Sequence, residues 1–314
     1  MDRWLVEPAA AGTRLDKYLA AAERLGSRRR AAEALARRKV FINAREATPD
    51  DAAAMLAPGD EIRVWMDRPG TSRRTRSIGE RRDLPIVYED DDIVVLNKPA
   101  GVLAVPLERR AAARSVYEDL REHLKGGRRR RVFVVHRIDR DTSGLVLFAK
   151  SAHAQEQLKT QFRRRAPARV YLAVVYGSVS PPSGTWRDRF LWDRKALIQK
   201  ETHLRDPAGK DAVCHYRVLE RLGPATLVEF SLVTGRRNQI RLQARLHGHM
   251  LVGEQRYTFG PESLRAIRFP RQALHALRLG FRHPATGREM SFVVPVPDDM
   301  AQLIQQLKGV SFNS

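Results

Sequence analysis

Apolar residues along the chain fall into short runs and alternating stretches that predict many strands and few helices. Uninterrupted apolar runs at residues 93–96, 132–135 and 145–149 are typical of strands buried on both faces. Further strands are predicted at residues 169–177, 216–219, 225–232, 274–281 and 290–294, with a polar hairpin at 184–209. Helical periodicity is present at residues 151–165 and 238–246. Because strands mostly follow strands, this part of the chain is predicted to be a mixed, largely antiparallel α+β domain.

The first eighty residues predict a separate, smaller unit of two helices and a short sheet. Thr13 is a candidate cap for a helix that ends at Gly26, and Ser27 starts a second basic helix. Short strands are expected at residues 40–43 and 61–65. Residues that follow are polar and basic without apolar periodicity, as in a linker. The predicted organisation is a small α/β domain, a basic linker and a large domain, at residues 1–66, 67–83 and 84–314.

Two charged segments of the large domain lack a clear structural pattern. The acidic run at residues 89–92 has neither metal-ligand spacing nor a histidine partner, so we interpret it as a solvated hairpin corner. Residues 107–131 end in four consecutive arginines. They are predicted to form a mobile loop that closes on phosphates, with plain disorder as the alternative.

Net charge points to a polyanionic partner. The chain has 57 Lys and Arg against 36 Asp and Glu, a formal net charge of +21, and nucleic acid is the usual partner of so basic a protein. Residues 84–314 hold 39 of the basic and 23 of the acidic side chains, so the large domain carries much of this charge itself. The single cysteine, Cys214, argues against a disulfide or a cysteine-based zinc site. No signal peptide or membrane span is expected, and a cytoplasmic location is predicted.

The candidate chemistry lies at residues 136–150, where a basic segment with two carboxylates leads into an apolar strand. Asp139 stands between Arg137 and Arg140, and nearby positive charge favours an ionised carboxylate. Taken alone, such a cluster is usually a surface ion pair. The chain contains no Gly-rich phosphate loop, no Gly-x-Ser-x-Gly elbow and no zinc-binding pair of histidines on a helix.

Residues 136–144, His-Arg-Ile-Asp-Arg-Asp-Thr-Ser-Gly, resemble the signature of the RluA-type pseudouridine synthases. Further similar motifs occur in the family's order across residues 84–300, at 97–101, 169–173, 234–241, 274–276 and 283–284. Residues 13–66 resemble the small RNA-binding domain first known from ribosomal small-subunit protein S-four. The resemblance implies isomerisation of uridine in RNA without metal or other cofactor, by a catalytic domain of the pseudouridine synthase fold.

The resemblance also implies residue roles. Asp139 matches the family's essential aspartate, acting as nucleophile at the sugar or as a base. Arg241 matches the arginine that pairs with it, and Tyr171 matches the tyrosine that stacks on the uracil and serves as an acid or base. Arg137 matches the residue that fills the stack when the target base is flipped out. Other residues expected to contact RNA are Arg140, Arg236, Arg28, Arg29, Arg37, Arg38 and Lys39.

Several positions depart from the family's usual residues. Asn238 and Gln243 stand where histidine is common, Glu254 replaces a frequent aspartate, and Arg169 replaces lysine. We expect none of these departures to touch the Asp139, Tyr171 and Arg241 set. Asp141 is expected to stabilise the loop by bonding Arg140, Ser143 or nearby backbone N–H groups.

The expected partner is structured RNA, and the additional N-terminal domain favours ribosomal over transfer RNA. Nothing in the sequence demands more than a monomer. Two other functions remain open from the residues: a non-catalytic RNA-binding or ribosome-assembly factor on the same fold, and an RNA glycosidase. The glycosidase has little support, because Asp139 lacks an obvious second carboxylate.

Overall fold

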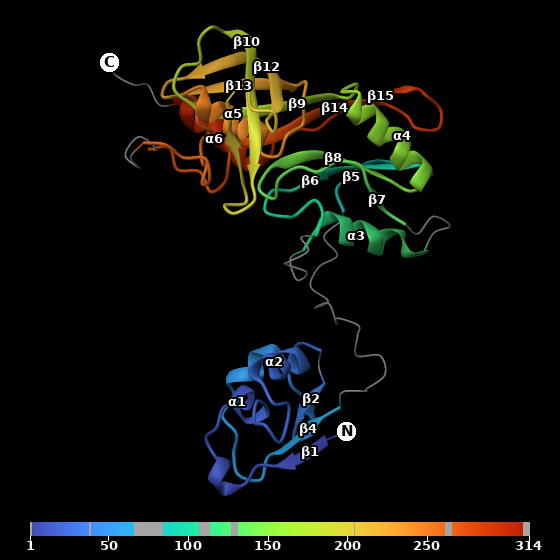
Figure 1. The fold of residues 1–314 in the computed structure, drawn as a ribbon, viewed down its shortest axis with the longest axis vertical. Coiled ribbons are helices and arrows are strands. Elements are labelled where there is room, and N and C mark those ends of the chain that lie inside the picture. The colour runs from blue at the N-terminus through green and yellow to red at the C-terminus, as the bar shows by residue number, and fades with distance from the viewer. Residues whose placement is uncertain are drawn as a thin grey trace. The chain divides into compact units, whose positions relative to one another are not determined.

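The computed structural model describes residues 2–37, 39–65, 84–106, 114–126, 131–203, 205–260 and 266–309. Contacts divide the chain into two compact units, Met1–Arg82 and Asp83–Ser314, each described by itself below (Figure 1). The segment predicted as a linker, residues 67–83, lies outside the described residues. Across the described ranges, no helix is long and apolar enough to cross a membrane.

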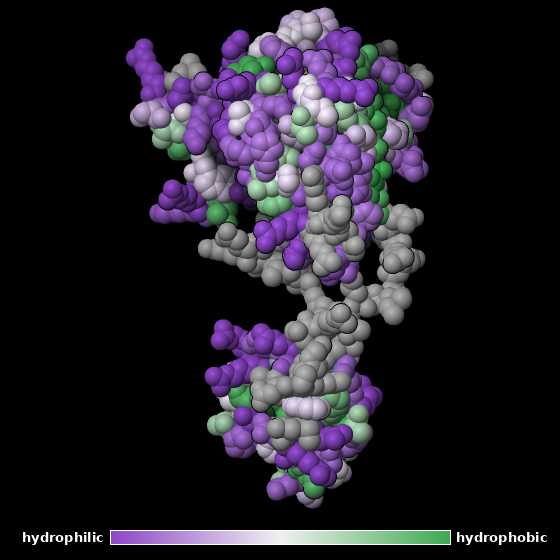
Figure 2. Space-filling view, turned by 90° about the vertical axis from the view of Figure 1, so that its right-hand side faces the viewer, coloured by the Kyte–Doolittle hydropathy of each residue, from purple (hydrophilic) through white to green (hydrophobic). Residues whose placement is uncertain are grey.

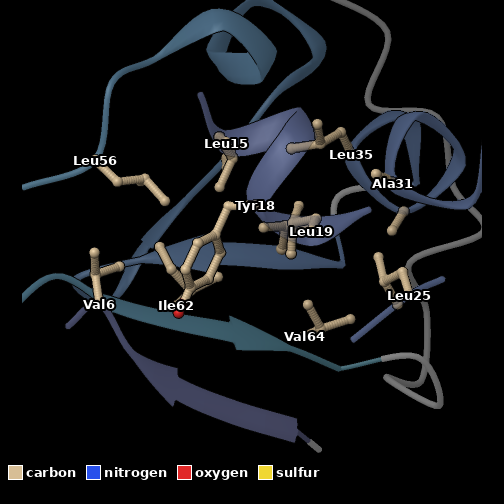
Figure 3. Close-up of a cluster of buried hydrophobic side chains, with 13 residues drawn as sticks. Val6, Leu15, Tyr18, Leu19, Leu25, Ala31, Leu35, Leu56, Ile62 and Val64 are labelled. Atoms are coloured by element: carbon tan, nitrogen blue, oxygen red, sulfur yellow. The ribbon is translucent and has the colours of Figure 1, made fainter. Parts of the chain in front are cut away.

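The N-terminal unit is a four-stranded sheet with two helices packed on it. Its strands are antiparallel in the order β1-β4-β2-β3. Its elements are β1 (Asp2–Leu5), α1 (Leu15–Leu19), α2 (Arg28–Ala36), β2 (Val40–Ile42), β3 (Arg45–Glu46) and β4 (Glu61–Val64), with 3₁₀ turns at Pro8–Ala10 and Pro49–Ala53. Figure 3 shows Tyr18 and Leu19 of α1 pointing toward Ile62 and Val64 of β4, and all four are buried in one apolar core.

The first helix is shorter than the sequence pattern predicts. Its N-cap position is Arg14 rather than Thr13, and it ends at Leu19. The chain then turns, because the backbone N–H of Leu25 bonds the carbonyl of Leu19 and brings the Leu25 side chain into the core. The second helix begins as predicted, with the Ser27 side chain accepting a hydrogen bond from the backbone of Arg30 at 3.2 Å.

The second unit is built on an eleven-stranded sheet, which confirms the mixed, largely antiparallel α+β prediction. Nine strands follow the order β11-β10-β12-β13-β9-β14-β8-β6-β5, with β15 paired to β14 and β7 paired to β8. Their bounds are β5 (Ile86–Glu89), β6 (Ile93–Lys98), β7 (Phe133–Val134), β8 (Ser143–Ala149), β9 (Ala168–Tyr176), β10 (Ser183–Asp193), β11 (Ile198–Glu201), β12 (Lys210–Leu222), β13 (Ala225–Leu232), β14 (Leu274–Arg282) and β15 (Glu289–Val293).

Helices cover both faces of this sheet, because alternate residues of a strand point to opposite sides. They are α3 (Val116–His123), α4 (Ala152–Arg163), α5 (Gln239–Leu246) and α6 (Asp298–Gly309). On β6, Val95 packs in the cluster under α4 whereas its neighbour Val94 packs under α3. On β9, Val175 packs with α5 and Val174 with α6. Figure 1 shows α3 and α4 on opposite sides of β6 and β8.

Some elements were not predicted. Of residues 107–131, which were expected to form a mobile loop, 107–113 and 127–130 lie outside the described residues. In the described part, α3 occupies Val116–His123, with Ser115 as its N-cap. Val116 and Leu120 bury the apolar side of this helix, a signal too short to stand out among its charges. Strand β1 and helix α6 were also missed. The acidic run at 89–92 does form the corner of the β5–β6 hairpin, as predicted. The expectation that it has no histidine partner is wrong, because His123 lies 3.0 Å from Glu89 and His283 lies 2.9 Å from Asp90.

One pairing in the sheet is parallel, and it positions the loop that contains Asp139. Strands β8 and β14 run side by side, with His275 opposite Ser143 and Ala276 opposite Gly144. Gly144 has φ of 109°, and a Cβ there would lie 2.3 Å from the carbonyl oxygen of Ala276. Only glycine permits this conformation and this approach. The loop that enters β8 is therefore held against β14.

Candidate active site

The Asp139 loop, residues 136–142, lies between β7 and β8 and is anchored by a buried lysine. Lys98 is fully buried at the end of β6. Its Nζ donates to the carbonyl oxygens of Pro99, Val102 and Arg140 at 2.7, 2.8 and 2.8 Å. Burial lowers the pKa of Lys98 to about 7, although the charges of Asp141 and Asp139 oppose this shift. Lys98 thus ties the β6 turn to the middle of the Asp139 loop.

A second anchor comes from the segment before β14. Arg271 donates to the carbonyl of Asp141 at 3.1 Å and forms a two-point ion pair with Asp299 of α6, at 2.7 and 2.9 Å. The side-chain amide of Gln272 donates to the Thr142 hydroxyl at 3.2 Å. Sequence reasoning missed Arg271 and Gln272 as supports of this loop. Their contacts join residues about 130 positions apart, a relation that no local pattern carries.

His136 fixes the start of the Asp139 loop as a neutral side chain. Its Nε2 accepts a hydrogen bond from the backbone N–H of Leu147 at 3.1 Å, and its ring stacks on Phe162 of α4 at 4.9 Å. Burial lowers the pKa of His136 to about 3. A neutral imidazole whose Nε2 accepts must carry its proton on Nδ1.

Asp139 is held by two side chains of the turn and helix around α5. Arg241 Nη1 lies 3.2 Å from Asp139 Oδ2, and the amide nitrogen of Asn238 donates to the same oxygen at 2.5 Å. The Asp139 side chain keeps 26% of its surface exposed, against 10% for Arg241. The structure therefore brings together the predicted Asp139–Arg241 pair, with the carboxylate still reachable from outside.

Glu254 holds the far side of the Arg241 guanidinium. Nε and Nη2 of Arg241 donate to the two Glu254 oxygens at 2.7 and 2.6 Å. Burial alone would lower the pKa of Arg241, but the bonds and charge of Glu254 and the charge of Asp139 raise it above its usual value. Burial works against the ionised form of Glu254 as well, yet Arg241 holds the pKa of this carboxyl below its usual value. The pair is ionised and fixed in one orientation.

The expectation that the departures from the family pattern leave this set untouched is wrong. Asn238 donates a hydrogen bond to Asp139, and Glu254 accepts one from Arg241. Asn238 has a left-handed backbone, φ 53°, which asparagine tolerates better than most residues. Its side-chain oxygen accepts from the Tyr257 hydroxyl at 3.2 Å, which turns its amide nitrogen toward Asp139. Gln243 instead bonds Asp188 and the Ala212 carbonyl, away from Asp139.

Tyr171 lies on β9 and packs against two apolar clusters, the one with α3 and the one with α5. Burial raises the pKa of Tyr171 to about 12, and the negative charge of Asp139 contributes to the shift while Arg169 opposes it. The hydroxyl therefore keeps its proton near neutral pH. Of the two chemical roles expected for this residue, a proton donor fits this pKa better than a base.

Of the predicted RNA-contacting arginines of this unit, Arg137 and Arg140 belong to the Asp139 loop and Arg236 lies in the turn before α5. Arg137 is exposed, and the described residues give its side chain no hydrogen bond or ion pair. Arg140 forms a two-point pair with Asp141 at 3.0 and 3.1 Å, one of the roles expected for Asp141. Arg236 is half-buried, with Nε donating to the Asp211 carbonyl at 2.7 Å. Burial lowers the pKa of Arg236, as does the neighbouring Arg165.

The other predicted RNA contacts belong to the N-terminal unit. Arg28 and Arg29 are exposed in the first turn of α2, and Arg37 is exposed just after it, 2.5 Å from Glu33. Lys39 is half-buried. Arg38 lies outside the described residues.

Comparison with known proteins identifies the class of enzyme that this chain resembles. The family model "RNA pseudouridylate synthase" matches residues 92–246. The chain is 39% identical to an uncharacterized RNA pseudouridine synthase of Bacillus subtilis, with 94% of both chains covered. It is 35% identical to ribosomal large subunit pseudouridine synthase D of Vibrio cholerae, covering 96% of this chain and 94% of the relative.

Solved structures show the same fold. Human RNA pseudouridylate synthase domain containing 4 superposes with a TM-score of 0.57 at 22% identity, over 71% of this chain and 92% of the human chain. By its sequence similarity to these relatives, the protein is an RNA-modifying isomerase. It belongs to the RNA pseudouridine synthase family.

Proposed function

We propose that this protein converts uridines of large-subunit ribosomal RNA to pseudouridine, with Asp139 as the residue that starts the reaction. The observation that carries the proposal is the Asp139–Arg241 pair, in which a partly exposed carboxylate is aimed by a guanidinium that Glu254 fixes from behind. A protein that only binds a polyanion gains nothing from presenting a carboxylate to it. The choice of ribosomal RNA is supported by the names of relatives such as the Vibrio cholerae enzyme.

The reaction breaks the bond between the ribose anomeric carbon and ring nitrogen N1 and forms a bond from that carbon to ring carbon C5. The proton on C5 is released and N1 gains one, so the base keeps its composition and no redox partner is needed. Asp139 acts either by attacking the anomeric carbon or by removing a sugar proton. Tyr171, protonated at neutral pH, stacks on the uracil and supplies a hydroxyl.

Access to a base inside folded RNA requires flipping it out of the stack. Arg137 is exposed and unpaired within the described part of the chain, two residues before Asp139. Its planar guanidinium can occupy the gap that the uridine leaves. Arg140 belongs to the Asp139 loop and Arg236 to the turn before α5, and both contact the RNA backbone in this proposal.

The N-terminal unit is proposed to dock on structured RNA as an S-four-like domain. Arg28 and Arg29 stand in the first turn of α2, where cations are disfavoured by the helix dipole. A placement that costs local stability suggests a partner that compensates it, and RNA phosphates do so. Arg37, Arg38 and Lys39 extend this basic segment. The proposed enzyme works as a monomer in the cytoplasm.

The proposal is tested by release of tritium from C5 of labelled uridine, using ribosomal and transfer RNA with wild type, Asp139→Asn and Asp141→Asn proteins. We expect release from large-subunit RNA with wild type, none with Asp139→Asn, and most of the activity with Asp141→Asn, whose carboxylate bonds only Arg140 among the described residues. Release from no RNA would favour a non-catalytic binder. Equal release by the Asp139 variant would remove it from the mechanism, and release from transfer RNA alone would correct the substrate.

A further inference from the structure

A pocket of about 480 Å³ beside the Asp139 loop is lined largely by cations. Among its lining residues are Lys159, Arg163, Arg165, Arg169 and Arg236, and none of the others is acidic. The pocket also touches Val135, which directly precedes the loop, and Phe162, on which His136 stacks. Hydrophilic residues cover most of the face of this unit that Figure 2 shows. A pocket that gathers positive charge at the start of the Asp139 loop is suited to bind an anion.

Protein carboxylates neutralise only part of this charge. Arg163 pairs with Glu156 at 2.6 Å, and Lys159 also acts on that carboxylate. Within the described ranges, Arg165, Arg169 and Arg236 form no ion pair. The Nη2 of Arg169 donates to the Val233 carbonyl at 3.3 Å, while its buried Nε has no hydrogen-bond partner in the described part of the chain. Burial lowers the pKa of Arg169 without a carboxylate to oppose it.

Arg165 occupies a position that is unfavourable for an arginine backbone. Helix α4 ends in a Schellman motif: the N–H of Ala166 bonds the carbonyl of Gln161, and the N–H of Arg165 bonds that of Phe162. In this motif glycine usually fills the left-handed position, yet here it is Arg165, with φ of 59°. Residues held in such sparsely populated backbone conformations cluster at ligand-binding and active sites.

We infer that this pocket binds a backbone phosphate of the RNA strand that carries the target uridine, with Arg165, Arg169 and Arg236 as its cations. The inference rests on the proposed function for the identity of the RNA. A phosphodiester is permanently charged, and arginine matches its oxygens with two parallel N–H donors. Because Arg236 lies two residues before Asn238, a phosphate bound here would hold the strand beside Asp139.

The test uses Arg165→Gly in the full-length protein. Glycine removes the charge and suits the left-handed backbone, so the variant should be at least as stable as wild type in urea unfolding. Its affinity for a fluorescein-labelled stem-loop of large-subunit ribosomal RNA should fall about tenfold. The slope of log K against log salt should shrink by about 0.7 to 0.9, the value for one lost phosphate contact.

Two further variants make the result decisive. Arg165→Asn also tolerates the left-handed backbone and should reproduce the loss, which excludes an effect of glycine flexibility. Arg217→Gln removes the same charge from an exposed pair with Glu229 on β12 and β13, and should leave the salt slope nearly unchanged. A loss of stability in urea without a change of the salt slope would show that Arg165 serves only to stabilise the end of α4. If the Arg165 and Arg217 variants had equal salt slopes, the change in binding would come from net charge alone. Either of these two results would overturn the inference.

RNA binding, followed by its salt slope, is measured separately from catalysis, followed by tritium release. If wild type releases no tritium, the proposed function fails, but the salt slopes still show whether the pocket binds a phosphate. If wild type is active and the Arg165 variants bind and react normally, the pocket inference fails by itself.

Discussion

The guanidinium of Arg241 lies between two carboxylates, with Nη1 3.2 Å from Asp139 and Nη2 2.6 Å from Glu254. The two acids differ in burial: the Glu254 side chain is fully buried, whereas Asp139 is partly exposed. This difference supports the proposed roles, in which Glu254 is the fixed support of Arg241 and Asp139 is the group that meets the substrate. The following predictions depend on this division and on the anchors of the Asp139 loop.

Replacing Glu254 with glutamine should leave Arg241 buried with half of its negative partners removed. Breaking a buried pair costs about 3 kcal/mol, so urea unfolding should show a loss of that order, and kcat should fall more than RNA affinity. Glu254→Asp keeps the negative charge on a shorter side chain and should recover part of kcat. Glu156→Gln breaks an exposed pair and should cost less than about 1 kcal/mol. A similar cost for both glutamine variants would contradict the buried role.

This pair also gives a pH dependence of stability. The pKa of Glu254 is lower in the folded protein than its usual value of 4.5. Its contribution is therefore complete above that value and is lost as the pH falls through the lower, folded-state pKa. Urea unfolding of wild type and Glu254→Gln in the acid range should show their difference in stability shrinking. A constant difference would show that Glu254 acts through packing rather than charge.

Asn238→Asp places a second carboxylate 2.5 Å from Asp139 in nearly the same shape. Two carboxylates so close cannot both ionise easily, and the pair titrates with one raised pKa. The acid limb of the kcat/KM profile for tritium release should move upward by about one pH unit or more. Gln255→Glu adds the same charge at an exposed neighbouring position and should leave the limb in place. An unshifted profile in Asn238→Asp would show that Asp139 does not control this limb.

Gly144→Ala should disrupt the entry of the Asp139 loop into the sheet. The new Cβ would lie 2.3 Å from the carbonyl oxygen of Ala276, and the backbone has φ of 109°. Gly287→Ala is the matched control, with φ of 69° and nothing within 4 Å. The control should cost about 1 kcal/mol of backbone strain, and Gly144→Ala several times more. Comparable midpoints in urea for the two variants would mean that the β8–β14 contact yields easily.

Lys98→Met should change how stability depends on pH. Lys98 has a pKa of about 7 in the folded protein against 10.5 ordinarily, so between these values the unfolded chain binds the extra proton. Stability should therefore rise through this window, by on the order of 1 kcal/mol per pH unit. Lys98→Met should lose that rise, whereas Lys200→Met, in an exposed pair with Asp193, should keep it. Parallel curves for wild type and Lys98→Met would show that Lys98 does not titrate in this range.

Most elements of the catalytic unit could be predicted from local patterns. The apolar residues of β8 and β13 and the helical periodicity of α4 each lie within one continuous stretch of sequence, so that stretch alone predicts the element. Helix α3 was missed because only Val116 and Leu120 among its eight residues are buried. The short α1 was extended wrongly because its end depends on Leu25 folding back onto Leu19, a contact outside the helical repeat.

The residues of the candidate site also divide into those that the sequence identified and those that only the structure showed. The sequence alone determined the class of chemistry, because the order of charged and small residues at 136–144 and the motifs that follow identify the family and single out Asp139, Tyr171 and Arg241. Only the tertiary structure decided what supports them: Glu254 behind Arg241, Asn238 against Asp139, and Lys98 and Arg271 under the loop. These are contacts between side chains and backbone groups far apart along the chain. Their partners are selected by how the strands of the sheet are ordered, which no single segment specifies.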